Sequence, residues 1–476
     1  MDKLLLERQC FLSQATWTDV DEFKVLIDAQ DYYQSFYQHT LKARKKIVIV
    51  GWDVDSRTKL LPNTQLTLKQ HLLQLVQNNC ELNIYILCWD FSIFTSSERE
   101  WGPWLFGSKW HERIEFIMDH HHPLFSSQHQ KIVTVDDQVV FVGGIDLCEN
   151  RLDNSEHLKE TSLRINSRGK SYKAFHDVQV LIRGKMAEPV IHIANQRWLQ
   201  ATKKDISLPF VTEPLDWETP GVVIGETASR LKGMVIETSP HKIKTKRKMD
   251  NLKATLELIK LARKYIYIEN QYLTHRRVIK ALGQKLTEGK IEITVVLPKK
   301  SFNWLENSTI HLVQRNALMK LREYDQYNKL KVVYPRIDYQ DKSLLYVHSK
   351  LMIVDNIFFK VGSSNLNHRS MGLDSECDVL FFSKDQEGKI KKIFLCLVSE
   401  HLGLSSEIVE QFLLNNKSLH LLINSRKESE RSLQEFPKEK IFLQNLWGIE
   451  PIFDRSSTVS WLKILEKPRS LLLGYR

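Results

Sequence analysis

Two short stretches of the chain each combine a histidine, a lysine and an aspartate at one spacing. They are His129-x-Lys131-x4-Asp136 and His348-x-Lys350-x4-Asp355. Side chains two residues apart on a strand point to the same face, so each imidazole and its lysine could bind one phosphate. One histidine could then attack phosphorus while the other protonates the leaving alcohol, and the lysines would neutralise the oxyanions. Fixed cations would replace a metal ion, so no metal is expected in this site.

The two stretches belong to an internal repeat. The second histidine follows the first by 219 residues, which is 348 minus 129, and Gly143 and Gly362 keep the same offset. The tripeptide Ala-Arg-Lys also recurs at this offset, at 43–45 and 262–264. One such motif would be weak evidence, but two in register indicate two copies of one structural unit.

Helical and strand-like segments alternate within each copy. This alternation predicts an α/β fold in which each half is a mixed sheet with helices on its faces. The expected elements of the two copies are amphipathic helices at 32–43 and 252–262, strands at 46–52 and 265–269, second strands at 82–88 and 291–297, and strands that carry the motif at 130–135 and 351–354.

The repeat also predicts the domain organisation. An N-terminal half is expected at 1–210 and a C-terminal half at 225–405, and the connection between them, at 202–227, holds three prolines. The repeat stops near residue 405, so 406–476 is expected to be an extension that is partly helical or mobile. Within it, the polar and charged stretch 415–440 predicts a loop or a weak helix.

Composition limits the class of protein. A chain of 476 residues with 42% hydrophobic residues can bury a large core, and no apolar run approaches the ~20 residues of a membrane span. The apolar stretch at the N-terminus is too short for a secretory signal, so we expect a cytoplasmic chain. Six cysteines without a C-x-x-C pair favour buried free thiols over a zinc site. The net charge of +11 would attract polyanions, either nucleic acid or an anionic membrane.

Longer stretches around both motifs match a known pattern. They are HQKIVTVDD at 129–137, FVGGIDL at 141–147, VHSKLMIVD at 347–355 and VGSSNLNHRS at 361–370, with GWDVDSR at 51–57 and IYIENQY at 266–272. These stretches resemble the HKD motifs of the phospholipase D superfamily, most closely its eukaryotic-type enzymes and their bacterial relatives. The resemblance covers most of residues 40–405. It implies two α/β halves about a pseudo-twofold axis, one active site at their interface, a phosphohistidine intermediate and no cofactor.

The resemblance also implies roles for single residues. His129 is expected to be the nucleophile and His348 the general acid and later base, although the reverse assignment is chemically equivalent from the sequence. Glu376 and Asp177 resemble the carboxylates that hold the catalytic imidazoles, crosswise, with Glu376 on His129 and Asp177 on His348. Such a partner fixes the tautomer of the ring and stabilises its cationic form.

The remaining polar residues of the motifs are expected to bind phosphate or to support the structure. Ser363 and Asn365 resemble a phosphate grip, because both can donate a hydrogen bond to an oxyanion. The first copy has Asp146 in the position of Asn365, and an ionised carboxylate would orient a neighbour instead. Asp136 and Asp355 lie an odd number of residues from the lysines, which puts them off the catalytic face and predicts a structural role.

Three other features have a functional and a structural interpretation. Asp119-His120-His121-His122 could bind a metal, but consecutive residues rarely converge on one ion, so no metal is expected there. The basic stretch 241–248 could dock on anionic lipid or be a solvated loop. Trp101, Trp104 and Trp110 could lie at a membrane interface or pack under the active site.

The predicted function is hydrolysis of the head-group phosphodiester of glycerophospholipids to phosphatidate and an alcohol. The alternatives are phosphatidyl transfer, as in cardiolipin synthases, then a nuclease or a catalytically inactive membrane-binding protein. The expected partner is a phospholipid surface, preferably anionic, with no nucleic acid, and the chain is expected to act as a monomer. It would associate peripherally with membranes from the cytoplasm, and delivery into another cell by a specialised secretion system stays open.

Overall fold

The computed structural model describes residues 16–90, 110–123, 126–208, 222–223, 231–240, 247–300, 304–338, 340, 343–386 and 388–437. No helix in these residues is long and apolar enough to cross a membrane. Trp101, Trp104 and residues 241–246, which the sequence singled out, lie outside the described residues.

The first sheet is built from the N-terminal part of the chain. Within the described residues it has eight strands, in the order β10-β2-β9-β7-β6-β3-β4-β5. The neighbours β3, β4 and β5 are parallel and the other pairings are antiparallel, so the sheet is mixed as predicted. Its strands are β2 (Glu22–Ile27), β3 (Lys46–Gly51), β4 (Asn83–Trp89), β5 (Ile114–Asp119), β6 (Ile132–Val135), β7 (Val139–Gly143), β9 (Val178–Arg183) and β10 (Val222–Val223).

The second sheet repeats this strand order. Its core path, β11-β19-β18-β17-β13-β14-β15, matches β2-β9-β7-β6-β3-β4-β5 strand for strand, and short strands are added at its ends. The pseudo-twofold axis that the resemblance implied stays a prediction. The strands are β1 (Thr18–Asp19), β11 (Lys232–Ser239), β12 (Lys248–Met249), β13 (Tyr265–Glu269), β14 (Glu292–Val296), β15 (Leu330–Arg336), β17 (Leu351–Val354), β18 (Phe358–Gly362), β19 (Glu376–Phe382) and β20 (Ser432–Glu435).

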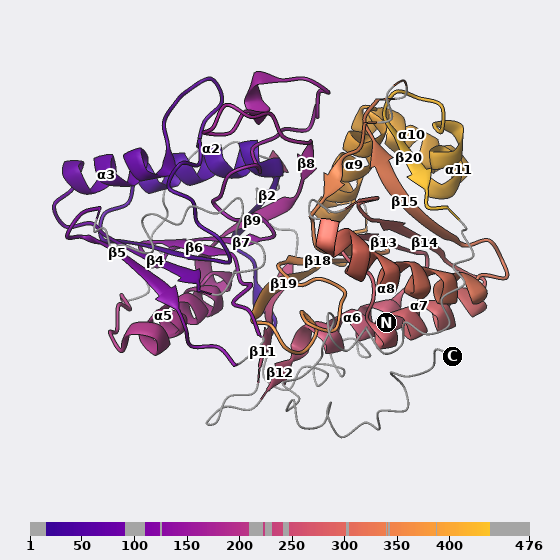
Figure 1. The fold of residues 1–476 in the computed structure, drawn as a ribbon. Coiled ribbons are helices and arrows are strands. Elements are labelled where there is room, and N and C mark those ends of the chain that lie inside the picture. The colour runs from indigo at the N-terminus through magenta and orange to yellow at the C-terminus, as the bar shows by residue number, and fades with distance from the viewer. Residues whose placement is uncertain are drawn as a thin grey trace, which may run out of the picture.

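Helices cover both faces of each sheet (Figure 1). Buried side chains of α2 and α3 pack on one face of the first sheet, and those of α6, α7 and α8 pack on one face of the second. Helices α5 and α9 cover the other faces. The predicted α/β fold is therefore confirmed. The helices are α2 (Asp28–Leu41), α3 (Leu68–Asn78), α5 (Glu188–Thr202), α6 (Asp250–Leu261), α7 (Arg276–Thr287), α8 (Trp304–Glu323), α9 (Lys389–Leu402), α10 (Ser406–Asn416) and α11 (Leu419–Ser425), with single turns η2 (Ser162–Arg164) and η3 (Gly184–Met186).

The two sheets meet in one shared core. Phe23 of β2 stacks on Phe381 of β19 with ring centroids 4.5 Å apart, and both belong to a cluster that includes apolar residues of both sheets. Beside this core, the short strands β8 (Phe175–His176) and β16 (Tyr346–Val347) pair in parallel. Segments that follow the first motif and precede the second are thus held against each other.

Two expectations for single elements were wrong. The strand expected to carry the first motif begins at Ile132 rather than at residue 130, because the preceding segment leaves its sheet and bonds to the other half. In the C-terminal extension, the stretch expected to be a loop or weak helix contains α11 and the strand β20. Leu433 of β20 is fully buried in the shared core, and β20 pairs with β15, so the described part of the extension completes the second sheet.

Candidate active site

The aspartates of the two motifs hold backbone rather than reacting groups. Asp136 accepts hydrogen bonds at 2.7 to 2.8 Å from the backbone N–H groups of residues 44–46, and Asp355 accepts them at 2.6 to 2.8 Å from those of residues 263–265. Both aspartates lie in tight turns with positive φ, 53° and 57°. Asparagine and aspartate tolerate this conformation better than most residues. These bonds tie each motif to the strand that starts after Ala-Arg-Lys.

Each motif histidine is held by backbone of the opposite half. The N–H of His129 donates to the carbonyl of Ser375 at 3.0 Å, and the N–H of His348 donates to the carbonyl of His176 at 2.8 Å. Both histidines therefore precede the regular strands β6 and β17 instead of lying in them. This crossing of the chain brings the two motifs to the junction of the halves.

The two histidines bond to buried carboxylates, also across the junction. His129 Nδ1 lies 3.0 Å from Glu376 Oε2, and His348 Nδ1 lies 2.6 Å from Asp177 Oδ2. The crosswise pairing that the resemblance implied is thus present. Both carboxylate side chains are fully buried, while the imidazoles are 16% and 13% exposed. With Nδ1 bonded to a carboxylate, Nε2 is the nitrogen of each ring that can meet a substrate.

The two motif lysines are buried beside the histidines. Lys131 Nζ lies 3.2 Å from Asp146 Oδ2 and donates to the carbonyl of His129 at 3.1 Å. Asp146 also accepts the N–H of Trp52 at 2.9 Å, so it orients its neighbours, as expected for a carboxylate in this position. Lys350 Nζ donates to the carbonyl of His348 and lies 2.9 Å from Nδ1 of the same ring.

Burial and these cations shift the pKa values of both histidines and of their neighbours Glu376 and Lys350. The pKa of His129 falls to about 3, first through burial and then through Lys131 and Lys350, and the pKa of His348 falls well below its usual value for similar reasons. Burial raises the pKa of Glu376 to about 8 and lowers that of Lys350 to about 7. Because each lysine acts on the opposite histidine, the two motifs form one electrostatic unit. A phosphodiester anion would favour the charged forms of the histidines and of Lys350.

Ser363 and Asn365, the two residues expected to bind phosphate, make hydrogen bonds within the protein. Ser363 Oγ donates to Glu376 Oε2 at 2.5 Å and accepts the N–H of Cys377 at 3.0 Å. Ser363 therefore orients the carboxylate rather than presenting its hydroxyl to an oxyanion. Asn365 donates to Gln271 Oε1 at 3.2 Å, and its own Oδ1 is buried without a hydrogen-bond partner in the described part of the chain.

Gly144 occupies the repeat position of Ser363, and the structure requires a residue without a side chain there. A Cβ on Gly144 would lie 2.1 Å from Asp177 Oδ1, far inside van der Waals contact. Asp177 receives the N–H of Val178 at 2.8 Å in place of a serine hydroxyl. The two copies therefore support their carboxylates by different means.

Sequence reasoning missed several residues that surround His348. The rings of Phe175 and Tyr346 lie 5.4 and 6.3 Å from its imidazole, between centroids. The charge of the half-buried Arg151 contributes to the low pKa of His348, and its guanidinium lies 4.9 Å from the centre of the Phe175 ring. Arg151 lies 219 residues before Ser370, a serine that bonds to Glu376. The sequence did offer one signal for this residue, because Arg151 is charged whereas Ser370, at the matching position of the second copy, is not.

The other candidate groups have structural contacts. His120 and His122 both contact Asp90, at 2.5 and 2.7 Å, and in the residues that the structure describes they do not gather with other ligands around one point. Trp110 is half-buried, with its ring 6.1 Å from that of Phe116. Of the basic stretch, Arg247 donates to the carbonyl of Gly372 at 2.7 Å, and Lys248 pairs with Glu237 at 3.1 Å.

Comparison with known proteins finds similarity to phospholipase D enzymes. The family model described as cardiolipin synthase, PLD-like domain matches residues 255–397. Phospholipase D A of Dictyostelium discoideum is 26% identical over 81% of this chain and 36% of its own length, and phospholipase D C of the same organism is 30% identical over 40% of this chain and 13% of its own. This chain thus spans about a third or less of these relatives.

A crystal structure of phosphatidylserine synthase from Haemophilus influenzae Rd KW20 shares the fold. The similarity covers 84% of this chain and 90% of that one, with a TM-score of 0.54 and 13% identity. The family match, the similarity to phospholipase D enzymes and the common fold agree with the double motif. Residues 255–397 thus match a PLD-like domain, and most of the chain is similar to phospholipase D enzymes.

Proposed function

We propose that this protein is a phospholipase D-type phosphodiesterase, which hydrolyses the head-group phosphodiester of glycerophospholipids to phosphatidate and an alcohol. The observation that carries the proposal is the crossed arrangement at the junction. Two imidazoles each bond to a buried carboxylate of the opposite half, with a buried lysine beside each ring. Such an arrangement suits in-line attack on a phosphodiester with opposite-side protonation of the leaving group.

The reaction would proceed in two balanced steps. In the first, His129 Nε2 attacks phosphorus, the bond to the head-group oxygen breaks, and His348 gives its Nε2 proton to that oxygen. Lys131 and Lys350 neutralise the non-bridging oxygens. In the second, His348 accepts a proton from water, the water oxygen attacks phosphorus, and the phosphorus–nitrogen bond breaks to release phosphatidate and restore His129.

Phosphatidyl transfer is the second candidate, because an alcohol can replace water in the second step. The family model that matches residues 255–397 carries the name of a cardiolipin synthase, which favours keeping this alternative. The deciding experiment is mass spectrometry of the products from mixed phospholipid vesicles, with and without added glycerol, ethanol or phosphatidylglycerol. Phosphatidate as the main product supports hydrolysis, and cardiolipin or phosphatidylalcohol as the main product supports transfer. Cleavage of DNA with intact lipids would overturn both.

A basic pocket beside the site supports an anionic lipid surface as the partner. It has a volume of about 410 Å³, and Tyr346, whose ring stacks near His348, forms part of its wall. The cationic side chains that line it are Lys159, Arg164, Lys173, Lys299 and Lys300. Cationic groups near a membrane surface each contribute roughly 1 kcal/mol of attraction to anionic lipid.

We further propose peripheral binding by a monomer through basic residues. Binding to vesicles should rise with the fraction of anionic lipid and fall with salt, since such attraction is screened beyond ~8 to 10 Å. Lys242, Lys244 and Lys246 are the residues to neutralise, because Arg247 and Lys248 have structural contacts. The triple variant should bind vesicles less and still cleave a soluble short-chain lipid. If vesicle binding by this variant did not depend on salt, insertion of apolar side chains into the membrane would be indicated instead. Association from the cytoplasm, or after delivery into another cell, remains part of this proposal.

A further inference from the structure

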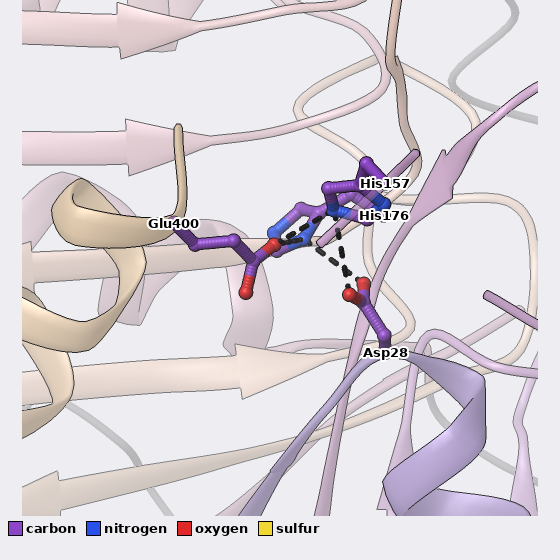
Figure 2. A group of neighbouring side chains, drawn as sticks. All are labelled: Asp28, His157, His176 and Glu400. Atoms are coloured by element: carbon purple, nitrogen blue, oxygen red, sulfur yellow. Dashed lines mark hydrogen bonds and ion pairs between the residues drawn. The ribbon is translucent and has the colours of Figure 1, made fainter. Parts of the chain in front are cut away.

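A second cluster of titratable side chains lies behind the active site. Asp28 begins α2, His157 lies in the loop after β7, His176 ends β8, and Glu400 lies in α9 (Figure 2). Their side chains are at most 4% exposed. The four residues come from both ends of the described chain, and the reaction proposed above uses none of them.

The four side chains converge on one point. Glu400 Oε1 lies 3.0 Å from His157 Nε2 and 2.6 Å from His176 Nδ1. On the other side, Asp28 Oδ1 lies 3.1 Å from His176 Nδ1, and Asp28 Oδ2 lies 3.4 Å from His157 Nε2. All ligand atoms lie within 4.8 Å of one another. Tetrahedral zinc with bonds of about 2.0 to 2.1 Å places its ligand atoms about 3.3 Å apart, close to these separations.

The outer nitrogens of both imidazoles are already bonded to carboxylates. His157 Nδ1 lies 3.0 Å from Asp153 Oδ2, and His176 Nε2 lies 2.9 Å from Glu269 Oε2. A histidine that donates its outer N–H to a carboxylate has its inner nitrogen free of a proton and ready to bind a metal. Glu269 also accepts hydrogen bonds from Ser349 and Tyr267, so it stays a supporting group.

Without a metal, the rings would be held as imidazolium ions, because burial lowers the pKa of both but the surrounding carboxylates outweigh it and raise that of His157 to about 9 and that of His176 well above its usual value. The directions of the contacts nevertheless suit a shared ion. His176 Nδ1 makes no well-directed hydrogen bond, although two carboxylate oxygens lie within 3.1 Å, and Asp28 Oδ2 makes none either. Both atoms are therefore aimed into the cluster rather than at a single partner.

The backbone supports the same arrangement. Asp28 has φ 64° and His157 has φ 44°, both in the left-handed region that side chains other than glycine rarely adopt. Such strain persists where the surroundings fix it, often at ligand-binding sites.

The geometry points to a buried zinc ion bound by Asp28, His157, His176 and Glu400. Two carboxylates balance the charge of a divalent ion, and a mixed set of imidazole and carboxylate ligands suits zinc. The ion joins α2, β8 and α9, and so clamps the N-terminal and C-terminal parts of the chain together. It takes no part in phosphoryl transfer, because His176 and the catalytic partner Asp177 are adjacent in the chain and point to different sides of it.

Metal analysis of the full chain, purified without a histidine tag, tests this proposal. We expect about one zinc per folded chain by plasma mass spectrometry, and a mass increase by one zinc in native mass spectrometry that acid removes. Glu400→Gln and His157→Gln should lose the zinc. Asp153→Asn should weaken its binding by about 10- to 100-fold, as substitutions behind a ligand do. His71→Gln is the matched control, because His71 is buried and bonded to Thr40 outside the cluster.

Cobalt provides a measurement that does not depend on whether variants fold. Wild-type protein unfolded with chelator and refolded with Co²⁺ should show the visible absorption of a tetrahedral site, and refolding with Zn²⁺ should raise the melting temperature. Metal-free wild-type protein with an unchanged melting temperature in Zn²⁺ would overturn the proposal and show that the cluster is a network of imidazolium and carboxylate ions.

Discussion

The two motif copies share a backbone plan but differ around their histidines. His129 bonds to Glu376, which Ser363 holds, whereas His348 bonds to Asp177, and Lys350 also lies 2.9 Å from its Nδ1. Nδ1 of His348 thus has both a carboxylate and a lysine within hydrogen-bond distance, whereas the matching nitrogen of His129 contacts a carboxylate that a serine holds. The repeat therefore places its two histidines in unequal surroundings, and we propose that their roles differ, with His129 as the nucleophile.

The largest expected effect comes from the histidines and tests this asymmetry directly. We expect His129→Asn and His348→Asn each to lower kcat for phosphatidylcholine by about 10⁴-fold or more, since each ring has a separate task. With a p-nitrophenyl ester, whose leaving group needs no proton, His348→Asn should recover much of its rate and His129→Asn should not. Burst kinetics with both substrates measure this. Recovery by His129→Asn instead would reverse the assignment.

Substitution of the two carboxylates should show the same dependence on the leaving group as substitution of the histidines, with a smaller loss of kcat. Glu376→Gln and Asp177→Asn should each lower kcat by about 10²- to 10⁴-fold, because the rings lose the partner that fixes their tautomer. Only the loss in Asp177→Asn should shrink with the p-nitrophenyl ester. Circular dichroism of both variants controls for folding. Equal losses with both esters would mean that the carboxylates serve packing alone.

The pH dependence should distinguish the two lysines. Lys350 has a pKa of about 7 through burial, so it is charged below pH 7 and loses its charge as the pH rises. We expect kcat/KM to fall about tenfold per pH unit above that value, and kcat to fall at higher pH, because the bound anion keeps the lysine charged.

Arginine variants can show which residue causes this fall in kcat/KM at alkaline pH, here called the alkaline limb of the pH profile. Lys350→Arg should move it upward, since arginine stays charged, whatever its effect on the absolute rate. Lys131→Arg should leave its position unchanged. A limb that stays in place in Lys350→Arg would assign it to another group, such as Glu376.

Ser363 and Gly144 offer a smaller test of how each carboxylate is supported. Ser363→Ala removes one hydrogen bond to Glu376 and should lower kcat by about threefold to tenfold, from roughly 0.5 to 1.5 kcal/mol. Gly144→Ala should cost more, because its Cβ would displace Asp177. Steady-state kinetics with one lipid ester measure both. A milder effect at Gly144 would mean that Asp177 can move without loss.

The motif aspartates should affect stability and hardly affect the rate. Asp136→Asn and Asp355→Asn each weaken three backbone hydrogen bonds and should lower the free energy of unfolding by about 1 to 3 kcal/mol in urea titrations. Asp355→Asn should cost more, since all its bonds are partly buried while two of those at Asp136 are exposed. A large loss of kcat in a folded variant would contradict the structural role.

Much of the secondary structure that supports the site follows from short-range patterns in the sequence. The strands after Ala-Arg-Lys and the α/β alternation depend on short-range patterns, and the structure has them close to the expected positions. The position of the motif histidines was less predictable, because His129 and His348 leave their strands to bond with the other half. The contact of Ser363 with Glu376 was not predictable for a similar reason, since the two residues become neighbours only in the folded sheet.

The sequence by itself determined the chemistry available, namely two imidazoles, two lysines and their common register. Only the tertiary structure decided which groups act together. Glu376 is 247 residues from His129, and Asp177 is 171 residues from His348, separations at which no local pattern constrains contact. The same holds for Arg151 beside His348 and for the cluster of Asp28, His157, His176 and Glu400. Their proximity arises from packing two sheets into one core, and that packing depends on the apolar faces of both halves together.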